Sequence, residues 1–235
     1  MSDSGFKGFP QSGLDFLRDL AQHNNREWFE AHKTDYQRHV LEPAQTFVNA
    51  VGERLQTLDP DIRFDSRGDG SGTLMRIYRD TRFSKDKSPY KSAISGIFWN
   101  GNGKKMARPG FGFHLEPSGM RLMAGLFGFT PDQLDAYRQS VLDDRMGKAL
   151  VRAAETVQAA GDYIVNGEQL KRVPAGFDAD HMRADWLRYK GLHAGSPAIS
   201  PKTVTSPQLV DTVFDHFRAM APIQQWLIQA FAHTS

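Results

Sequence analysis

The chain has 235 residues, of which 40% are hydrophobic and 24% are charged, a balance that is typical of a globular protein and argues against a disordered one. The formal net charge of +2 does not by itself indicate a nucleic-acid partner. The absence of cysteine excludes disulfides, thiol nucleophiles and cysteine metal sites. No apolar run approaches the ~18 residues of a membrane span, and the N-terminal residues lack the apolar core of a signal peptide. We therefore expect a cytoplasmic protein with no membrane partner.

Residues 12–58 are predicted to form three helices. Ser12 is a suitable N-cap for the first helix, whose apolar side chains recur at helical spacing: Leu14, Phe16, Leu17 and Leu20. Asn24 or Asn25 can cap the second helix, and Pro43 suits the first turn of the third. The N-terminal part is therefore expected to be helical.

A turn-rich stretch, residues 59–72, separates these helices from a series of short predicted strands. In the first, Thr73–Arg79, alternation puts Leu74, Arg76 and Tyr78 on one face. Three more strands follow, and the Gly, Pro and Ser turns between them favour an antiparallel sheet: Ile94–Asn100, Phe111–Glu116 and Met120–Phe127. Strands and helices do not alternate along the chain, which argues against a doubly wound parallel sheet.

The C-terminal part returns to helical patterns. Thr130 and Asp143 are suitable caps for two helices, and residues 209–231 carry a further apolar stripe. Residues 161–205 are predicted to be irregular, apart from a short helix near Asp180–Tyr189. We therefore predict one α+β domain spanning all 235 residues, in which an antiparallel sheet packs with helices from the N-terminal and C-terminal parts.

The most unusual stretch is the segment from Arg76 to Lys91, here called the basic loop, which reads RIYRDTRFSKDKSPYK. It holds six cations and two anions, so its local charge of +4 exceeds the net charge of the whole chain. Arg offers a planar fork for phosphate or carboxylate, and Lys offers a mobile point charge. In the alternative interpretation, Asp80 and Asp86 pair locally with the cations and the loop is only a solvated surface. The candidate ligand-binding residues are Arg79, Arg82, Ser84, Lys85, Lys87, Tyr90 and Lys91.

Two further basic segments are weaker candidates. Residues 104–108 (KKMAR) could extend the patch of the basic loop if they lie on the hairpin after the second strand. Residues 171–190 contain five cations interrupted by aspartates, and these cations could contact nucleic acid. No recognised nucleic-acid-binding module is visible in either segment.

His114 is the candidate catalytic residue. Glu116 follows two positions later in the same predicted strand, so both side chains share one face, and such a pair suits acid–base chemistry. The alternative is a hydrogen-bonded structural histidine. His32 and His39 are too few ligands to predict a metal site, and no nucleotide fingerprint or nucleophile elbow occurs. We therefore predict no metal and no cofactor.

Four segments resemble, in their order along the chain, motifs of the family called domain of unknown function 2461. The longest is RDTRFSKDKSPYK at 79–91, and the others are HNNREWFEAHKTDY at 23–36, GFHLEPSG at 112–119 and LKRVPAGF at 170–177. Phe113 stands where many members carry Tyr, which removes a hydroxyl. The resemblance implies a single α+β domain and favours an anion site, because the basic loop identifies the family. It transfers no catalytic residue, because no activity is established for the family.

The motif at residues 24–29 has two interpretations. In the first, it is a helix cap followed by aromatic residues of the core. In the second, Asn25 or Arg26 lies at the rim of a pocket that is formed together with the basic loop.

Three functions follow from these patterns, and the sequence leaves all three open. The first is a pocket that binds a phosphorylated or carboxylated small ligand, with His114 as acid or base if the protein is an enzyme. The second is a nucleic-acid-associated module that contacts the phosphate backbone through the same loop. In the third, the loop is structural and pins the sheet to the helices through buried Arg–carboxylate pairs. A concave pocket would favour the first function, and a flat basic surface the second. The sequence predicts no oligomeric state.

Overall fold

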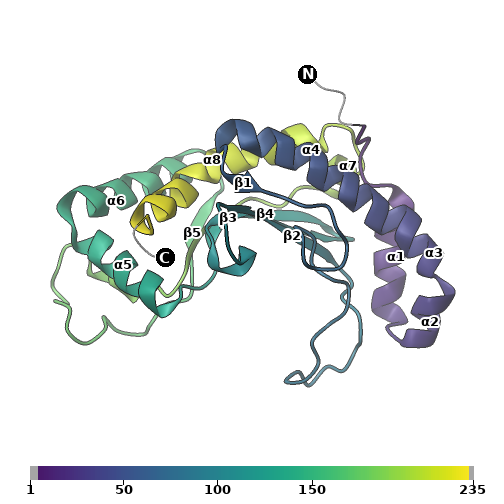
Figure 1. The fold of residues 1–235 in the computed structure, drawn as a ribbon, viewed down its shortest axis with the longest axis horizontal. Helices are drawn as coiled ribbons and strands as arrows, with labels where there is room; N and C mark the ends of the chain where they lie inside the picture. Colours follow the sequence, from purple (N-terminus) through teal and green to yellow (C-terminus); the bar gives the residue numbers. More distant parts are fainter. Residues whose placement is uncertain (1–4, 233–235) are drawn as a thin grey trace. The chain divides into compact units, whose positions relative to one another are not determined.

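The computed structural model describes residues 5–232 (Figure 1). The N-terminal part is helical: α1 (Gln11–Gln22), α2 (Arg26–Ala31), α3 (Lys33–Tyr36), the π-helical turn η1 (Gln37–Leu41) and α4 (Glu42–Leu58). The central part contains β1 (Ile62–Arg63), β2 (Ile94–Asn100), the 3-10 turn η2 (Lys105–Ala107), β3 (Gly110–Glu116) and β4 (Gly119–Leu126). The C-terminal part contains α5 (Pro131–Leu142), α6 (Asp144–Ala159), β5 (Ile164–Asn166), the 3-10 helix η3 (Ala184–Arg188), β6 (Leu192–Gly195), α7 (Pro201–Val204) and α8 (Leu209–Ala230). No helix in the described part of the chain has both the length and the apolar character that crossing a bilayer requires.

Within residues 5–232 the strands form one six-stranded antiparallel sheet in the order β1-β2-β3-β4-β6-β5. β4 pairs with β6 so that Met123 lies opposite Gly195 and Leu126 lies opposite Leu192. The predicted fold class, α+β with an antiparallel sheet, is confirmed.

The chain divides into two compact units. Of the described residues, the first unit contains 5–98, 112–122 and 198–215, and the second contains 99–111, 123–197 and 216–232. In the first unit the rings of Phe47 in α4 and Phe113 in β3 are 5.1 Å apart between centroids. In the second unit the rings of Phe217 in α8 and Phe111 in β3 are 5.0 Å apart. Helices from both ends of the chain thus pack on the sheet, as predicted, while the prediction of a single domain stays a prediction.

The segment Thr73–Arg79 is not a continuous strand, contrary to the prediction. It makes only isolated antiparallel bridges, between Leu74 and Gly96 and between Tyr78 and Tyr90. Tyr78 lies four residues after Leu74, but Tyr90 lies six residues before Gly96. Between the two bridges, the stretch from Tyr90 to Gly96 is thus two residues longer than the stretch from Leu74 to Tyr78. The two stretches cannot keep one ladder register, so the longer one must buckle. The basic loop leaves the sheet at this buckle.

The helix caps follow the sequence with one exception. α1 begins directly after Pro10, so Ser12 lies inside the first turn and is not the N-cap that we predicted. The carbonyl of Pro10 already closes this turn by accepting a hydrogen bond from a backbone N–H in it. Asn25 caps α2, and Thr130 and Asp143 cap α5 and α6 as predicted.

Residues 161–205, which we predicted to be irregular, contain β5 and β6. These strands have only three and four residues, and β6 reads LHAG. Strands this short hold too few apolar positions to show an alternation. The short helix predicted near Asp180–Tyr189 is present as the 3-10 helix η3.

Candidate functional site

The basic loop is a hairpin that extends beyond the strands of the first unit (Figure 1). Two aspartates brace it from within. Asp80 accepts hydrogen bonds from the backbone N–H of Arg82 at 3.2 Å and from its guanidinium at 2.7 and 3.0 Å. Asp86 accepts hydrogen bonds from the hydroxyl and the backbone N–H of Ser88 at 2.5 and 2.9 Å. The local pairing that we considered as the alternative interpretation is therefore present.

This pairing leaves most of the positive charge of the loop uncompensated. The carboxylate of Asp86 also binds the guanidinium of Arg79. Lys87 and Lys91 instead donate to backbone carbonyls, Lys87 to that of Thr81 at 2.8 Å. Among residues 5–232, the loop cations other than Arg79 and Arg82 have no carboxylate partner. The loop is thus internally braced and still strongly cationic.

Asn24 fastens the base of the loop to the N-terminal helices. Its side-chain amide donates to the carbonyl of Tyr90 and accepts from the N–H of Tyr90, both at 3.0 Å. The side-chain amide of Asn24 thus pairs with both backbone polar groups of the buried Tyr90, as the backbone of a neighbouring strand would. The ring of Tyr90 also stacks on Phe29 of α2, with centroids 4.1 Å apart. Asn24 and this stack, rather than a buried Arg–carboxylate pair, hold the loop against the helices, because both ion pairs of the loop are local and partly exposed.

A cleft of about 570 Å³ lies where the base of the loop meets α2. We call it the loop cleft. Three cations and one carboxylate line it, so the lining carries a net charge of +2. The side chain of Arg26 makes no ion pair or hydrogen bond within the described part of the chain, so its guanidinium is available to a ligand. The lining residues are Arg26, Glu30, Tyr78, Arg79, Thr81, Lys87, Pro89 and Tyr90.

The phenols near the loop cleft are neutral hydrogen-bonding groups. Burial raises the pKa of Tyr36 to about 12, and the neighbouring phenol of Tyr78 adds to this rise. Burial also raises the pKa of Tyr90, with smaller contributions from Tyr78 and Glu30. Tyr36 and Tyr90 therefore keep their protons at neutral pH and can donate hydrogen bonds.

The loop cleft contains only part of the predicted ligand-binding set. Arg79, Lys87 and Tyr90 line it. The remaining predicted residues, Arg82, Ser84, Lys85 and Lys91, are not among the lining residues.

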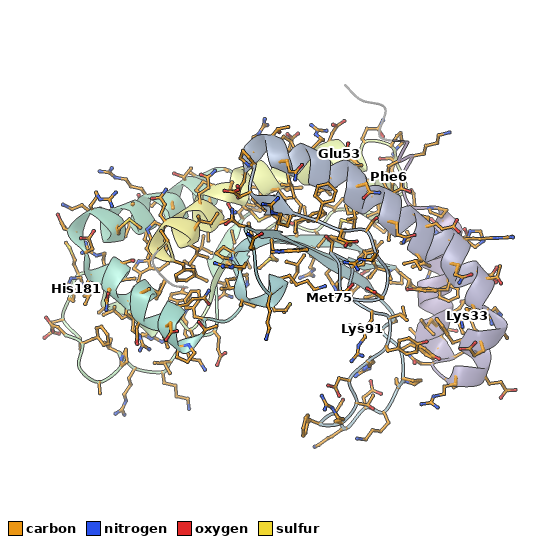
Figure 2. The ribbon with its side chains drawn as sticks, viewed as in Figure 1. Phe6, Lys33, Glu53, Met75, Lys91 and His181 are labelled. Carbon is orange, nitrogen blue, oxygen red and sulfur yellow. The ribbon has the colours of Figure 1, made fainter. Side chains whose placement is uncertain are left out.

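Two of these other residues have visible local roles. Arg82 is 77% exposed in its side chain, and it lies over the ring of Phe83 at 5.7 Å. Nζ of Lys91, which marks the base of the loop in Figure 2, donates to the carbonyl of Arg76 at 3.0 Å. Burial lowers the pKa of Lys91, and the nearby Arg76 lowers it further.

For the motif at residues 24–29, the sequence left two interpretations open, a helix cap or a pocket rim that includes Asn25 or Arg26. The structure contains both features. Asn25 is the helix cap, and Arg26 lines the cleft. The sequence did not predict that Glu30 and Thr81 line the cleft, or that Asn24 contacts Tyr90. A signal for Glu30 was available, because it lies one helical turn after Arg26 and so shares its face.

His114 lies outside the loop cleft, in a hydrogen-bonded chain on the sheet. Its Nδ1 is 2.8 Å from the hydroxyl of Ser95, and its Nε2 is 3.1 Å from Glu116. Ser118 donates to the other oxygen of Glu116 at 3.3 Å. Each ring nitrogen of His114 therefore has one hydrogen-bonding partner. The predicted pairing of His114 with Glu116 is present, while a catalytic role stays a prediction. The described residues contain no group of three His, Asp or Glu side chains placed to hold a metal ion.

The two weaker basic segments both lie in the second unit. Residues 104–108 do lie between β2 and β3, but in the second unit, so whether they extend the patch of the loop stays a prediction. In the segment 171–190, Arg183 is buried and donates to the carbonyl of Val141 at 2.7 Å. Arg188 donates to the carbonyl of Leu170 at 3.0 Å. These arginines hold the backbone together and do not form a solvated basic surface.

The bracing of the loop predicts a specific acid titration. Hydrogen bonds from Ser88, and then one from Arg79, lower the pKa of Asp86 from 3.8 to about 2. A carboxylate with a lowered pKa stabilises the loop above its usual pKa, and this stabilisation is lost as the pH falls through 2. In a carbon-13 NMR titration we expect the Asp86 carboxyl to have a midpoint near 2.

The Ser88→Ala variant should raise the Asp86 midpoint toward 3.8. The midpoint of Asp80, whose pKa Arg82 lowers to about 2, should not move in this variant and serves as the control. An Asp86 midpoint near 3.8 in the unmodified protein would show that the bracing is absent in solution.

The model of the family described as "Conserved hypothetical protein (DUF2461)" matches residues 12–226. The chain belongs to this family. A search of curated proteins found no match to the chain. The four segments that suggested the DUF2461 family therefore belong to a match that covers most of the chain.

Two of the DUF2461 segments meet at the candidate site. Asn24, in the segment at 23–36, holds the backbone of Tyr90, in the segment at 79–91. The same two segments supply all the lining residues of the loop cleft except Tyr78. The loop cleft is thus built from the stretches by which the chain resembles its family.

Proposed function

We propose that the loop cleft binds the phosphoryl or carboxyl group of a small ligand. The observation that carries this proposal is the convergence of Arg26, Arg79 and Lys87 on one cleft, against the single carboxylate of Glu30. A volume of about 570 Å³ lies within the range of small-molecule sites. We place this function in the cytoplasm as part of the proposal, because a chain without cysteine suits a reducing compartment.

The arrangement of the cations supports an anion rather than a neutral ligand. Arg79 is held by Asp86, and Lys87 is held by the carbonyl of Thr81, so both are oriented before a ligand arrives. Each keeps further N–H donors for an anion. Arg26, which has no partner in the described structure, can give a bidentate contact. Prior orientation lowers the entropy cost of binding.

A second candidate function is binding of single-stranded nucleic acid by the tip of the loop. Phe83 is 94% exposed there, between Arg82 and Lys85. An exposed aromatic ring among cations is the arrangement on which bases stack in sequence-tolerant binding. The concave loop cleft favours the first function, and the projecting tip favours this second one.

A pair of lysine variants tests the proposed function. Lys87→Met removes a cation from the cleft, and Lys85→Met removes an exposed cation of the same loop that does not line it. In isothermal titration with orthophosphate, we expect Lys87→Met to weaken binding about tenfold, which is typical of a lost charge-assisted hydrogen bond. Lys85→Met should stay within about twofold of the unmodified protein, because Lys85 does not line the cleft and its exposed charge is screened by solvent.

Equal losses in the two variants would mean that only the general charge of the loop matters, and would contradict a site in the cleft. A short single-stranded oligonucleotide in the same assay tests the second candidate. Binding that falls steeply with salt and is lost in Phe83→Ala, with no binding of orthophosphate, would replace the first function by the second.

A further inference from the structure

A second cleft, of about 380 Å³, lies beside the loop cleft in the first unit. Its walls are mainly apolar and aromatic, in contrast to the cationic loop cleft. Arg76 and Lys33 are its cations, and Asp69 is its only carboxylate. Its lining residues are Phe29, Lys33, Tyr36, Gln37, Leu41, Gly68, Asp69, Arg76, Ile77 and Tyr78.

The two clefts share a thin partition. Tyr78 lines both of them and is 48% exposed. Phe29 lines the second cleft, and Tyr90, on which it stacks at 4.1 Å, lines the loop cleft. The rings of Tyr78 and Tyr90 are 5.4 Å apart between centroids. The two clefts are therefore separated by no more than a few aromatic rings.

The rim between the clefts is also shared. Glu30, which lines the loop cleft, forms an ion pair at 3.3 Å with Lys33, which lines the second cleft. This pair offsets the charge of Lys33, so Arg76 is the cation of the second cleft without a carboxylate partner among residues 5–232. The second cleft consequently offers apolar surface with little net charge, whereas the loop cleft offers positive charge.

Three hydroxyl groups at the partition are available to a ligand. Within residues 5–232, the hydroxyls of Tyr36, Tyr78 and Tyr90 make no hydrogen bond to the protein. Tyr36 is only 8% exposed, yet its ring lines the second cleft. Partly buried hydroxyls without a protein partner are usually satisfied by water or by a bound molecule.

We propose that the two clefts bind the two parts of one amphipathic ligand, with an anionic head in the loop cleft and an apolar body in the second cleft. This inference rests on the proposed function and adds the class of ligand: a small phosphate monoester or carboxylate with an alkyl or aryl group. The apolar body lies against Phe29, Leu41 and Ile77, and the tyrosine hydroxyls lie near the junction of head and body. The combined site explains why an apolar cleft adjoins a cationic one.

The test compares hexyl phosphate with orthophosphate, and hexanoate with acetate, in isothermal titration. Burial of the hexyl chain should make hexyl phosphate bind at least about tenfold tighter than orthophosphate. Hexanoate carries an alkyl chain one methylene shorter on a carboxylate and shows which head group the loop cleft prefers. Tighter binding of either amphipathic anion than of its short counterpart, orthophosphate or acetate, supports the proposal.

Two variants locate the two parts of the ligand. Leu41→Gln makes a wall of the second cleft polar, so hexyl phosphate should lose most of its advantage while orthophosphate binding stays within about twofold. Arg26→Gln should weaken both phosphates. Leu142→Gln, at a partly exposed leucine in the second unit, is the matched control and should change neither.

The outcomes separate this inference from the proposed function. If orthophosphate binds and Arg26→Gln weakens it, but the hexyl chain adds nothing, the loop cleft stands and the amphipathic ligand is overturned. A hexyl advantage that survives Leu41→Gln overturns the second cleft as the place of the apolar body. If neither phosphates nor carboxylates bind, the proposed function and the inference fall together.

Discussion

Replacing Asn24 by alanine should lower the free energy of unfolding by about 2–3 kcal/mol. The variant removes two hydrogen bonds at once, and it leaves the N–H and the carbonyl of the buried Tyr90 without their partner. Unsatisfied buried backbone groups cost about 1–3 kcal/mol each, which water entering the gap partly recovers. Urea denaturation followed by tryptophan fluorescence measures the change.

The same variant should weaken orthophosphate binding, although Asn24 does not line the loop cleft. Asn24 is a positioning residue, because it holds the backbone of Tyr90, whose side chain is a wall of the cleft. Asn49→Ala, at an exposed position of α4, is the matched control and should change stability by no more than about 0.5 kcal/mol. Equal stability of the two variants would show that the amide of Asn24 does not hold the loop.

Replacing Arg183 by methionine should lower the free energy of unfolding by about 3 kcal/mol. Arg183 is 6% exposed, and its guanidinium donates to the carbonyls of Val141, Leu142 and Asp143 at 2.7, 3.2 and 3.5 Å. The carbonyls of Val141 and Leu142 lie at the C-terminal end of α5, where no helical N–H is available to them, while the carbonyl of Asp143 also accepts from the N–H of Gly147. Hydrogen bonds from a charged donor contribute about 1.5–3 kcal/mol, and their loss leaves buried acceptors unsatisfied.

Methionine keeps the aliphatic part of the side chain and removes the guanidinium, so the loss measures the hydrogen bonds more than the packing. Gly147 gives the guanidinium its room, because a Cβ there would lie 2.4 Å from Nε of Arg183. Arg145→Met, at an exposed position of α6, is the control and should stay within about 0.5 kcal/mol. A loss of that small size in Arg183→Met would mean that water satisfies the carbonyls as well as the arginine does.

Arg183 and Asn24 show a common limit of reasoning from sequence. In the sequence Arg183 is one of five cations interrupted by aspartates, a pattern that is typical of a solvated surface. Its burial depends on carbonyls about 40 residues away. Asn24 finds its partner 66 residues away. Neither partner could be inferred, because contacts between distant backbone groups leave no pattern in the residue types.

The basic loop shows the same limit of sequence reasoning at the candidate site. Its charge, its two aspartates and their local pairing could all be predicted from residues 76–91. Which cations face the cleft could not be predicted, because the expected strand alternation reached only as far as Arg79. The buckle between the two bridges breaks this alternation. The side-chain directions of Arg79 and Lys87 therefore depend on how the two stretches pair in three dimensions.

The sequence by itself determined the α+β class, the caps at Thr130 and Asp143, the bounds of β2 and the family, because these depend on short-range periodicity and on continuous motifs. The tertiary structure alone decided that Arg26 joins Arg79 and Lys87 at one cleft, and that a second, apolar cleft lies behind Tyr78. The physical reason is that a cleft is formed by surfaces from separate segments. The charge and shape of the loop cleft depend on the angle between α2 and the loop. Asn24 holds the loop beside α2 through its hydrogen bonds to Tyr90, a residue far away in the chain.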